Sequence, residues 1–300
     1  MSDYVESSGI LDNPKEKDFG IFDYSTGEII GGMNYGDIIT SREELQRRAE
    51  EKQKRLEHEA TRYRSNGRKY YFVKSDSKFN DISPAMVTRL IYLSTYVGYG
   101  NSVLMLTAKT KMKRVDLQDI LGLSKRHTVN FWKEVNSLYV SEDENGYLVL
   151  NDDMFKRGKL KRKQSIPYQQ FYIDGVRKLY EAASVSQHKQ LGYLFSMLPY
   201  ISVEYNLLCH NPYEKDMGKV KLMSIAEFCN EIGYSISNVG RLKRIYNAVR
   251  FDVDGRQERF CTMIYNGLDE NSAKICINPN VLYAGTNEGC IEVSKLYFRD

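Results

Sequence analysis

The segment Leu117-Gln-Asp-Ile-Leu-Gly-Leu-Ser124 recurs in altered form as Phe228-Cys-Asn-Glu-Ile-Gly-Tyr-Ser235. In each segment a short apolar-patterned helix would end at a glycine, which permits a sharp turn, and a serine would cap the following helix. A helix, a glycine turn and a second, capped helix are typical of a helix–turn–helix unit. We therefore expect two such units in this chain.

Two further pairs of segments flank these turns in the same order. The opening helices share Leu90-x-Tyr92-Leu93 and Leu191-x-Tyr193-Leu194, and the closing segments run Asn151-Asp-Asp-Met-Phe-Lys-Arg-Gly158 and Asn278-Pro-Asn-Val-Leu-Tyr-Ala-Gly285. Three ordered matches indicate that residues 83–158 and 186–285 are two copies of one unit.

The first copy carries the signals of three helices followed by a hairpin. Ser83-Pro84 predicts the start of the opening helix, and the second and third helices are predicted at 116–121 and 125–136, on either side of Gly122. Asn145-Gly146 between two apolar runs is a strong hairpin signal. This order of elements is that of a winged helix.

The second copy has the same signals with a longer β region. A helix at 223–232 would end at Gly233, and Ser235 or Ser237 would cap a third helix that runs to about residue 247. Strands at 249–253, 257–265 and 274–277 would then form a three-stranded wing sheet. The predicted fold class is mainly α with small β wings (α+β), a tandem winged helix–turn–helix with little sheet beyond the wings.

Four regions are predicted along the chain: an N-terminal arm at 1–69, a first winged-helix domain at 70–160, a basic linker and linker helix at 161–185, and a second winged-helix domain at 186–300. The arm would hold a small hairpin at 19–30 and a charged helix at 41–64. With so few apolar residues, that helix would be a solvated arm, a coiled coil or a basic DNA-binding helix. A strand is predicted at Tyr70–Val73, and Phe171, Val176, Leu179 and Tyr180 form the apolar stripe of the linker helix.

The third helix of each copy is the candidate for DNA recognition. In the first, Thr128, Phe131 or Trp132, and Val135 would face inward, while Arg and Asn side chains, which can bond guanine and adenine edges, would face outward. In the second, Val239, Leu242 and Ile245 or Tyr246 would be buried. The second copy would contact DNA or serve as a dimerisation module. The candidate DNA-binding residues on these helices are Ser124, Lys125, Arg126, His127, Asn130 and Lys133, and Ser237, Asn238, Arg241 and Arg244.

The basic linker is a second candidate contact, because lysines and arginines outside a helix would bind phosphates rather than bases. Its candidate residues are Lys156, Arg157, Lys159, Lys161, Arg162 and Lys163. The wing tips are acidic, with Glu142-Asp-Glu144 in the first copy and Asp269-Glu270 in the second. Phosphates would repel these tips, so neither is expected to enter a groove.

Composition excludes several classes. The net charge of +4 permits nucleic-acid binding but does not require it, and the five cysteines include no Cys-x-x-Cys pair. We expect reduced, mostly buried thiols, no metal site, no cofactor and a cytoplasmic protein without a membrane span. No phosphate-binding loop, dinucleotide-binding or metalloprotease motif occurs, so the chain is not expected to be an enzyme.

Residues 74–160 resemble the winged-helix region of phage and plasmid replication proteins of the RepL type from low-GC Gram-positive bacteria. The resemblance lies in residues 104–109, in Leu121-Gly-Leu-Ser124, in Phe131-Trp132 and in Asn151-x-x-Met-Phe-x-x-Gly158. Asp23-x-x-Thr-Gly-Glu28 and Gln169-Gln-Phe-Tyr172 extend it to a longer form in which the winged-helix unit is duplicated. The resemblance implies DNA binding in a bacterial host cell, at a replication origin or at a transcriptional control site.

The sequence thus predicts a non-enzymatic, sequence-specific double-stranded DNA-binding protein of a phage or plasmid, acting as a transcriptional regulator or as a replication initiator. A homodimer and host replication or transcription proteins are further candidate partners. The alternative class is an interaction protein whose winged helices bind a host polymerase or replication protein instead of DNA, because fold alone does not fix function. A nuclease or strand transferase is the third class.

Overall fold

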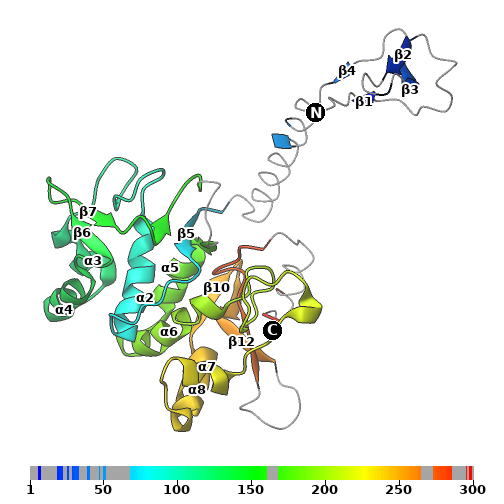
Figure 1. The fold of residues 1–300 in the computed structure, drawn as a ribbon. Helices are drawn as coiled ribbons and strands as arrows, with labels where there is room; N and C mark the ends of the chain where they lie inside the picture. The colour runs from blue at the N-terminus through cyan, green and yellow to red at the C-terminus, as the bar shows by residue number, and fades with distance from the viewer. Residues whose placement is uncertain are drawn as a thin grey trace. The chain divides into compact units, whose positions relative to one another are not determined.

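A computed structural model of the chain describes residues 68–160, 168–264 and 273–285, with short segments nearer the two ends (Figure 1). The chain divides into two compact units, Met1–Arg64 and Ser65–Asp300. In the first unit, β1 (Glu6–Ser7) pairs with β4 (Ile39–Thr40), and β2 (Phe19–Phe22) pairs with β3 (Ile29–Met33), both antiparallel. The second pairing confirms the hairpin predicted at 19–30. Of the charged helix predicted at 41–64, Arg47, Glu50 and Glu51 are described as helical, and the rest lies outside the described residues.

The second unit is a mixed α+β structure. Its described helices are α2 (Pro84–Leu93), α3 (Leu117–Leu121), α4 (Lys125–Val135), α5 (Ile173–Ala182), α6 (His188–Phe195), α7 (Ile225–Glu231) and α8 (Val239–Ala248). Its described strands are β5 (Tyr70–Lys74), β6 (Val140–Glu142), β7 (Leu148–Leu150), β8 (Phe155–Lys156), β9 (Tyr168–Tyr172), β10 (Arg250–Val253), β11 (Arg256–Arg259), β12 (Cys261–Ile264) and β13 (Lys274–Ile277). Short 3₁₀ turns join them at Ser94–Tyr96, Arg114–Asp116, Val185–Gln187, Leu198–Tyr200, Met217–Lys219 and Ile236–Asn238.

The local signals of the first copy are confirmed. Pro84 is in the first turn of α2 with Ser83 before it, and Gly122 ends α3 in the left-handed conformation at φ 59°. Ser124 is the N-cap of α4 and accepts a hydrogen bond from the backbone N–H of His127 at 3.5 Å. The β6–β7 hairpin turns at Gly146, with φ 72°. A left-handed residue at each turn explains why glycine stands there.

In the second copy, the predicted helices are present but the predicted three-stranded sheet is wrong. The predicted serine cap is wrong: Ser235 precedes a 3₁₀ turn without a side-chain cap hydrogen bond, and α8 starts only at Val239, after Asn238. Strands β10 and β11 pair through a tight turn at Asp254-Gly255, whereas β12 and β13 pair as a separate two-stranded sheet. The break falls at Phe260, whose side chain is buried and whose carbonyl accepts a hydrogen bond from the backbone of Asn278 at 2.8 Å.

The same backbone pairings recur in both copies. In the first copy the paired residues are Val97 with Leu104, Val103 with Val149, Met105 with Lys111, and Lys113 with Tyr147. In the second copy the equivalent pairs, in the same order, are Ile201 with Leu208, Leu207 with Cys276, Cys209 with Leu222, and Ser224 with Lys274. By these pairings, Leu90 of the first copy is structurally equivalent to Leu194 of the second copy. The sequence match had predicted that Leu90 is equivalent to Leu191. That match was wrong by one helical turn, because residues on one helical face repeat every three or four positions.

A central sheet lies outside both hairpin regions, which contradicts the prediction of little sheet beyond the wings. β5 runs between β8 and β9 in the order β8-β5-β9, with antiparallel pairing throughout. Residues 168–172 therefore form a strand, and the predicted linker helix starts only at Ile173. The strand forms because every residue of Tyr168–Tyr172 has a partner in β5, and its aromatic residues favour strands.

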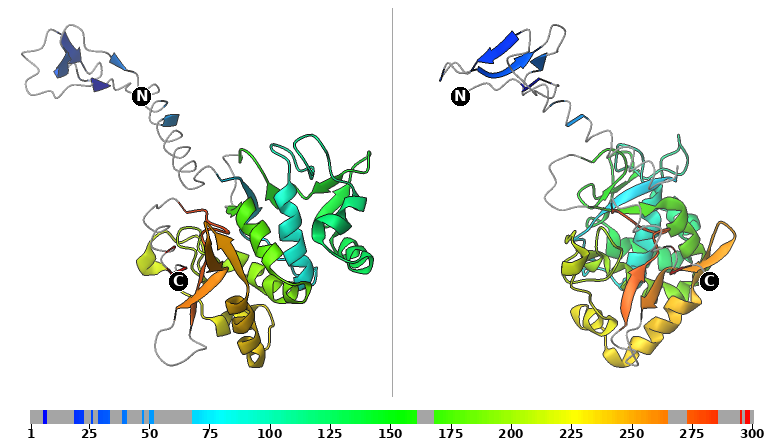
Figure 2. Two further views of the ribbon diagram at one scale, coloured as in Figure 1. Left: turned by 180° about the vertical axis from the view of Figure 1, so that it is seen from behind. Right: turned by 90° about the vertical axis from the view of Figure 1, so that its right-hand side faces the viewer.

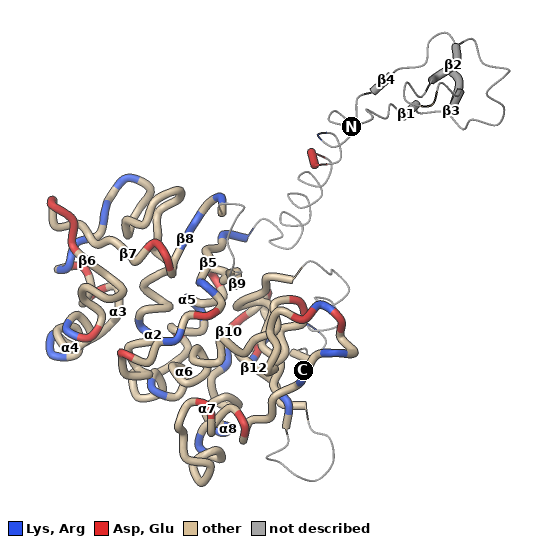
Figure 3. Tube along the Cα trace, viewed as in Figure 1, with Lys and Arg blue, Asp and Glu red and all other residues tan. Residues whose placement is uncertain are grey.

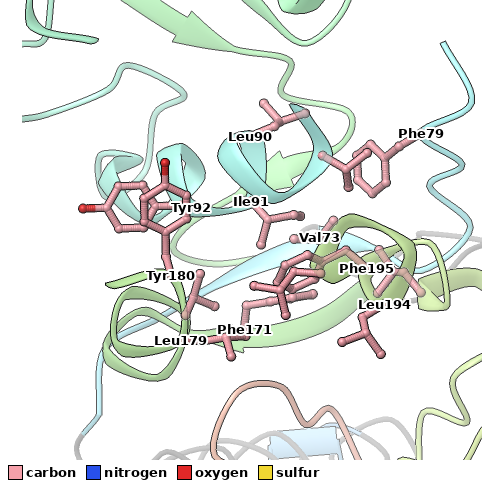
Figure 4. Close-up of a cluster of buried hydrophobic side chains, with 14 of the residues drawn as sticks. Val73, Phe79, Leu90, Ile91, Tyr92, Phe171, Leu179, Tyr180, Leu194 and Phe195 are labelled. Atoms are coloured by element: carbon pink, nitrogen blue, oxygen red, sulfur yellow. The ribbon is translucent and has the colours of Figure 1, made fainter. Parts of the chain in front are cut away.

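The core of the second unit lies where α2 and α6 pack against each other, as both views in Figure 2 show. Figure 4 shows apolar side chains from β5, α2, β9, α5 and α6 meeting there, including Leu90, Phe171 and Leu194. Tyr92 of α2 stacks on Tyr180 of α5, with ring centroids 3.9 Å apart. The buried Tyr92 and Tyr180 thus serve packing.

The α2–α6 contact is also close at the backbone. Thr88 Oγ1 donates a hydrogen bond to the carbonyl of His188 at 2.8 Å. A Cβ placed on Gly192 would overlap the backbone carbonyl of Pro84. The helices thus meet through one short side chain at Thr88 and with no side chain at Gly192. The buried residues of the two copies belong to one continuous core.

Candidate nucleic-acid interface

The faces of α4 divide as the sequence predicted, except that Thr128, predicted to face inward, is half-buried and lines a surface groove. Phe131, Trp132 and Val135 are buried, while the opposite face is exposed to solvent. The exposed candidate residues are Lys125, Arg126, His127, Asn130 and Lys133. Figure 3 shows the basic residues on α4 away from the acidic tip of the β6–β7 hairpin.

The N-terminus of α4 favours an anion. Ser124 Oγ lies 3.1 Å from His127 Nδ1, and Thr128 Oγ1 donates to the carbonyl of Ser124 at 3.1 Å. The first turn holds no acidic residue and starts with Lys125 and Arg126. The positive end of the helix dipole and two cations therefore lie together.

A basic strand beside α4 was missed by the sequence reasoning. Lys111 and Lys113 flank Met112, which is fully buried, so both lysines project from the same exposed side of an extended segment. Their Nζ atoms lie 4.8 and 5.3 Å from the centroid of the Tyr147 ring on the hairpin. The signal in the sequence was the alternation Lys109-x-Lys111-x-Lys113, which becomes a row of charge only when the chain is extended.

Arg114 connects this strand to α4. Its guanidinium lies 5.1 Å from the centroid of the Trp132 ring, and Arg114 and Lys125 line the same shallow groove of about 500 Å³. Val115 and Val129 line the groove as well, and their side chains are 81% and 38% exposed. The groove therefore combines two cations, Arg114 and Lys125, with the carboxylate of Glu142 and an apolar surface. We define the basic face as Lys109, Lys111, Lys113, Arg114, Lys125, Arg126 and Lys133.

The tip of the β6–β7 hairpin is acidic, as predicted. Asp143 stabilises the turn, because its carboxylate accepts hydrogen bonds from the backbone N–H of Asn145 at 2.9 Å and of Tyr147 at 2.8 Å. Glu142 and Glu144 are exposed. The tip would repel a phosphate backbone. The predicted second tip, Asp269-Glu270, lies outside the described residues.

Two residues assigned to the basic linker belong to the sheet instead. Lys156 is in β8, half-buried, with its Nζ 5.4 Å from the centroid of the Tyr168 ring. Arg157 follows directly and donates from Nη1 to the carbonyl of Val97 at 3.0 Å, and burial lowers the pKa of its guanidinium. They are held inward because β8 pairs with β5. Lys159 is exposed, whereas Lys161, Arg162 and Lys163 lie outside the described residues.

Arg157 should therefore act on stability and not on DNA affinity. Arg157→Met removes a charge-assisted hydrogen bond to a backbone carbonyl and should lower the free energy of unfolding by about 1–2 kcal/mol, measured by urea titration. The matched variant Lys159→Met, at an exposed position, should leave unfolding unchanged. Equal stability of the two variants would contradict the structural role.

The exposed face of α8 differs in composition from that of α4. Val239, Leu242 and Tyr246 are buried. The candidate residues Ser237, Asn238, Arg241 and Arg244 are all exposed. Ser237 Oγ lies 2.8 Å from Ser235 Oγ. A Cβ on Gly240 would meet no atom within 4 Å, so this glycine does not serve contact with a neighbouring helix in this structure.

The described cysteines, Cys209, Cys229, Cys261 and Cys276, are buried and free. Burial raises the pKa of the Cys209 and Cys229 thiols to about 11. They are packing residues rather than nucleophiles, because the thiolate is the reactive form. Within the described residues, His, Cys, Asp and Glu form no group that could hold a metal ion.

Among the residues that the structure describes, no helix has the length and apolar character needed to cross a membrane. No protein-family model, curated protein or solved structure matches this chain.

Proposed function

We propose that the chain is a non-enzymatic, sequence-specific double-stranded DNA-binding protein built from two winged-helix units. It would act in a bacterial host as the regulator or replication initiator of a phage or plasmid, in line with the resemblance to RepL-type replication proteins. The observation that carries the proposal is the basic face, in which Arg114, at the end of the exposed Lys109–Arg114 segment, contacts Trp132 of α4 and lines one groove with Lys125. A face of this kind suits a duplex, which presents phosphates on both sides of each groove.

Within this face, the residues would divide between base contacts and phosphate contacts. Arg126 and Asn130 lie about one turn apart on the exposed side of α4, where they could reach neighbouring base edges. Lys111 and Lys113 are on a strand that precedes the helix pair, so they would contact phosphates. The acidic hairpin tip would stay outside the groove.

A second candidate function is protein binding. The observation that favours it is the exposed Val115, which lines the groove with Val129 and Trp132. An apolar surface of this kind would accept an apolar side chain of a host polymerase or replication protein. DNA binding is preferred because two cations, Arg114 and Lys125, line the groove against one carboxylate, Glu142, and Lys125 continues into the exposed basic side of α4.

Salt-titrated affinities on specific and random duplexes would test the assignment. Arg126→Ala or Asn130→Ala should cost about 1–3 kcal/mol at the preferred site and relax specificity there. Lys111→Gln with Lys113→Gln should weaken binding to all duplexes alike, and should lower the salt slope by roughly one unit per lost contact.

Lys78→Gln is the matched control, since Lys78 is exposed but lies outside the basic face. It should change neither affinity nor slope. If the strand variants lost sequence preference while the helix variants kept it, the two roles would be reversed. If no variant altered duplex affinity, protein binding would replace DNA binding as the proposal.

A further inference from the structure

The pairing of β5 with β9 relates the two copies by a local two-fold axis. Val73 of β5 pairs with Phe155, and Phe171 of β9 pairs with Leu282, which holds the matching position in the second closing segment. Val73 and Phe171 are therefore equivalent positions. It follows that Phe72 is equivalent to Gln170, one position earlier, and these two residues pair with each other. When a residue of one copy pairs with the equivalent residue of the other copy, a two-fold axis passes between the two residues.

Backbone hydrogen bonds at both edges of the sheet repeat this relation. The N–H of Lys74 donates to the carbonyl of Met154 at 2.9 Å, and the N–H of the equivalent Tyr172 donates to the carbonyl of Val281 at 2.8 Å. Each closing segment thus pairs with the strand that starts its own copy. The sheet is symmetric about the β5–β9 centre.

The contact between α2 and α6 is reciprocal in the same way. α2 starts at Pro84 and α6 at His188, which makes these residues equivalent and also makes Thr88 equivalent to Gly192. Thr88 bonds to the backbone of His188, and Gly192 lies against the backbone of Pro84. Residue i contacts j, and the counterpart of i contacts the counterpart of j, as in an isologous dimer interface.

We infer that one chain of this protein recognises an imperfect inverted repeat in duplex DNA, with α4 on one half-site and α8 on the other. The inference rests on the proposed function. A two-fold axis that relates the copies would place α4 and α8, which hold equivalent positions in them, at the same level on opposite sides of the axis; Figure 1 labels both helices. Duplex DNA has two-fold axes perpendicular to its length, so helices related in this way meet sites of opposite orientation.

The half-sites should differ, because equivalent exposed positions carry different side chains. With Ser124 matched to Ser235, Asn130 corresponds to Arg241 and Arg126 to Ser237. Asparagine bonds adenine bidentately, whereas arginine bonds guanine. At the base pair that these two positions address, the first half-site should carry adenine and the second guanine.

The first half-site should also be held more tightly. Lys111 and Lys113 correspond to Leu222 and Ser224, as the recurring backbone pairings show. The second copy thus lacks the basic strand. Phosphate contacts next to α4 should exceed those next to α8, and the half-site under α4 should tolerate fewer base changes.

Selection of binding sites from a randomised duplex library with the full chain tests the inference. The expected product is an inverted repeat with unequal halves, bound by one chain, with the stoichiometry measured by sedimentation of the complex. Asn130→Arg should change the preferred base from adenine to guanine in one half only and make the halves more alike. Asn130→Ala should reduce preference in that half by about tenfold and leave the other half unchanged.

Arg241→Ala should do the same for the other half. Selection of a single half-site or a direct repeat, or two chains bound to one repeat, would overturn the inference while leaving DNA binding intact. Failure to enrich any duplex, with no shift of random duplex at low salt, would overturn the proposed function itself, and the inference with it.

Discussion

Gly192→Ala is expected to lower the free energy of unfolding by about 3 kcal/mol, at the upper end of the usual cost of overpacking a core. The added Cβ would overlap the carbonyl of Pro84, and backbone atoms on both helices would have to separate. Separation would loosen the α2–α6 contact on which the shared core depends. The midpoint of thermal unfolding should fall by roughly 5 °C for a chain of this size.

Gly240→Ala is the matched control, because Gly240 is also inside an α-helix but has open space around its Cα. Alanine there should raise stability by up to about 1 kcal/mol, since glycine disfavours the helical conformation. The two substitutions are chemically identical and should have opposite signs. A stabilising effect of Gly192→Ala would mean that the two helices do not meet as closely as the structure has them.

Stability should fall by about 3 kcal/mol as the pH drops from about 6.5 to about 4, because of His188 alone. Burial and the nearby Arg89 cation lower the pKa of His188 to about 4, whereas an unfolded histidine titrates near 6.5. Between these values the unfolded chain binds more protons than the folded chain. The stabilisation is therefore complete above pH 6.5 and is lost as the pH falls through 4.

The environment of His188 makes this assignment specific. Its ring is buried and lies 4.5 Å from the ring of Tyr180, and burial also lowers the pKa of Arg89 beside it. His188→Phe keeps a ring against Tyr180 and should remove most of the pH dependence in this range, measured by urea unfolding at several pH values. His127→Phe, at an exposed position on α4, should leave the dependence in place. An unchanged slope in His188→Phe would refute the assignment.

Local signals predicted the helix ends well, and long-range pairing explains what they missed. The turn at Gly122 and the cap at Ser124 depend on residues within one turn of each other, so a single sequence contains them. Tyr168–Tyr172 was predicted as helix because it runs directly into α5 without a break. Only its pairing with β5, far back in the chain, makes it a strand.

The candidate site was predicted in part for the same reason. The exposed face of α4 follows from helical periodicity. Arg114 is brought to α4 by its contact with Trp132, Lys113 is placed by its pairing with Tyr147 of the hairpin, and Lys111 by its pairing with Met105. Arg157 was expected in solvent because its sequence neighbours are basic, but the pairing of β8 turns it toward Val97.

The position of β5 has a consequence for synthesis. It precedes the helices of the first copy, whereas β8 closes that copy and β9 follows it in the chain. During translation, β5 can therefore pair with β8 on one edge, but its other edge stays unpaired until residues 168–172 have left the ribosome, so the central sheet is complete only when the second copy has begun to emerge. A nascent chain stalled between the copies would expose that edge and the apolar side of α2. Because both surfaces are exposed, it would associate with other nascent chains instead of remaining a folded, monomeric first copy.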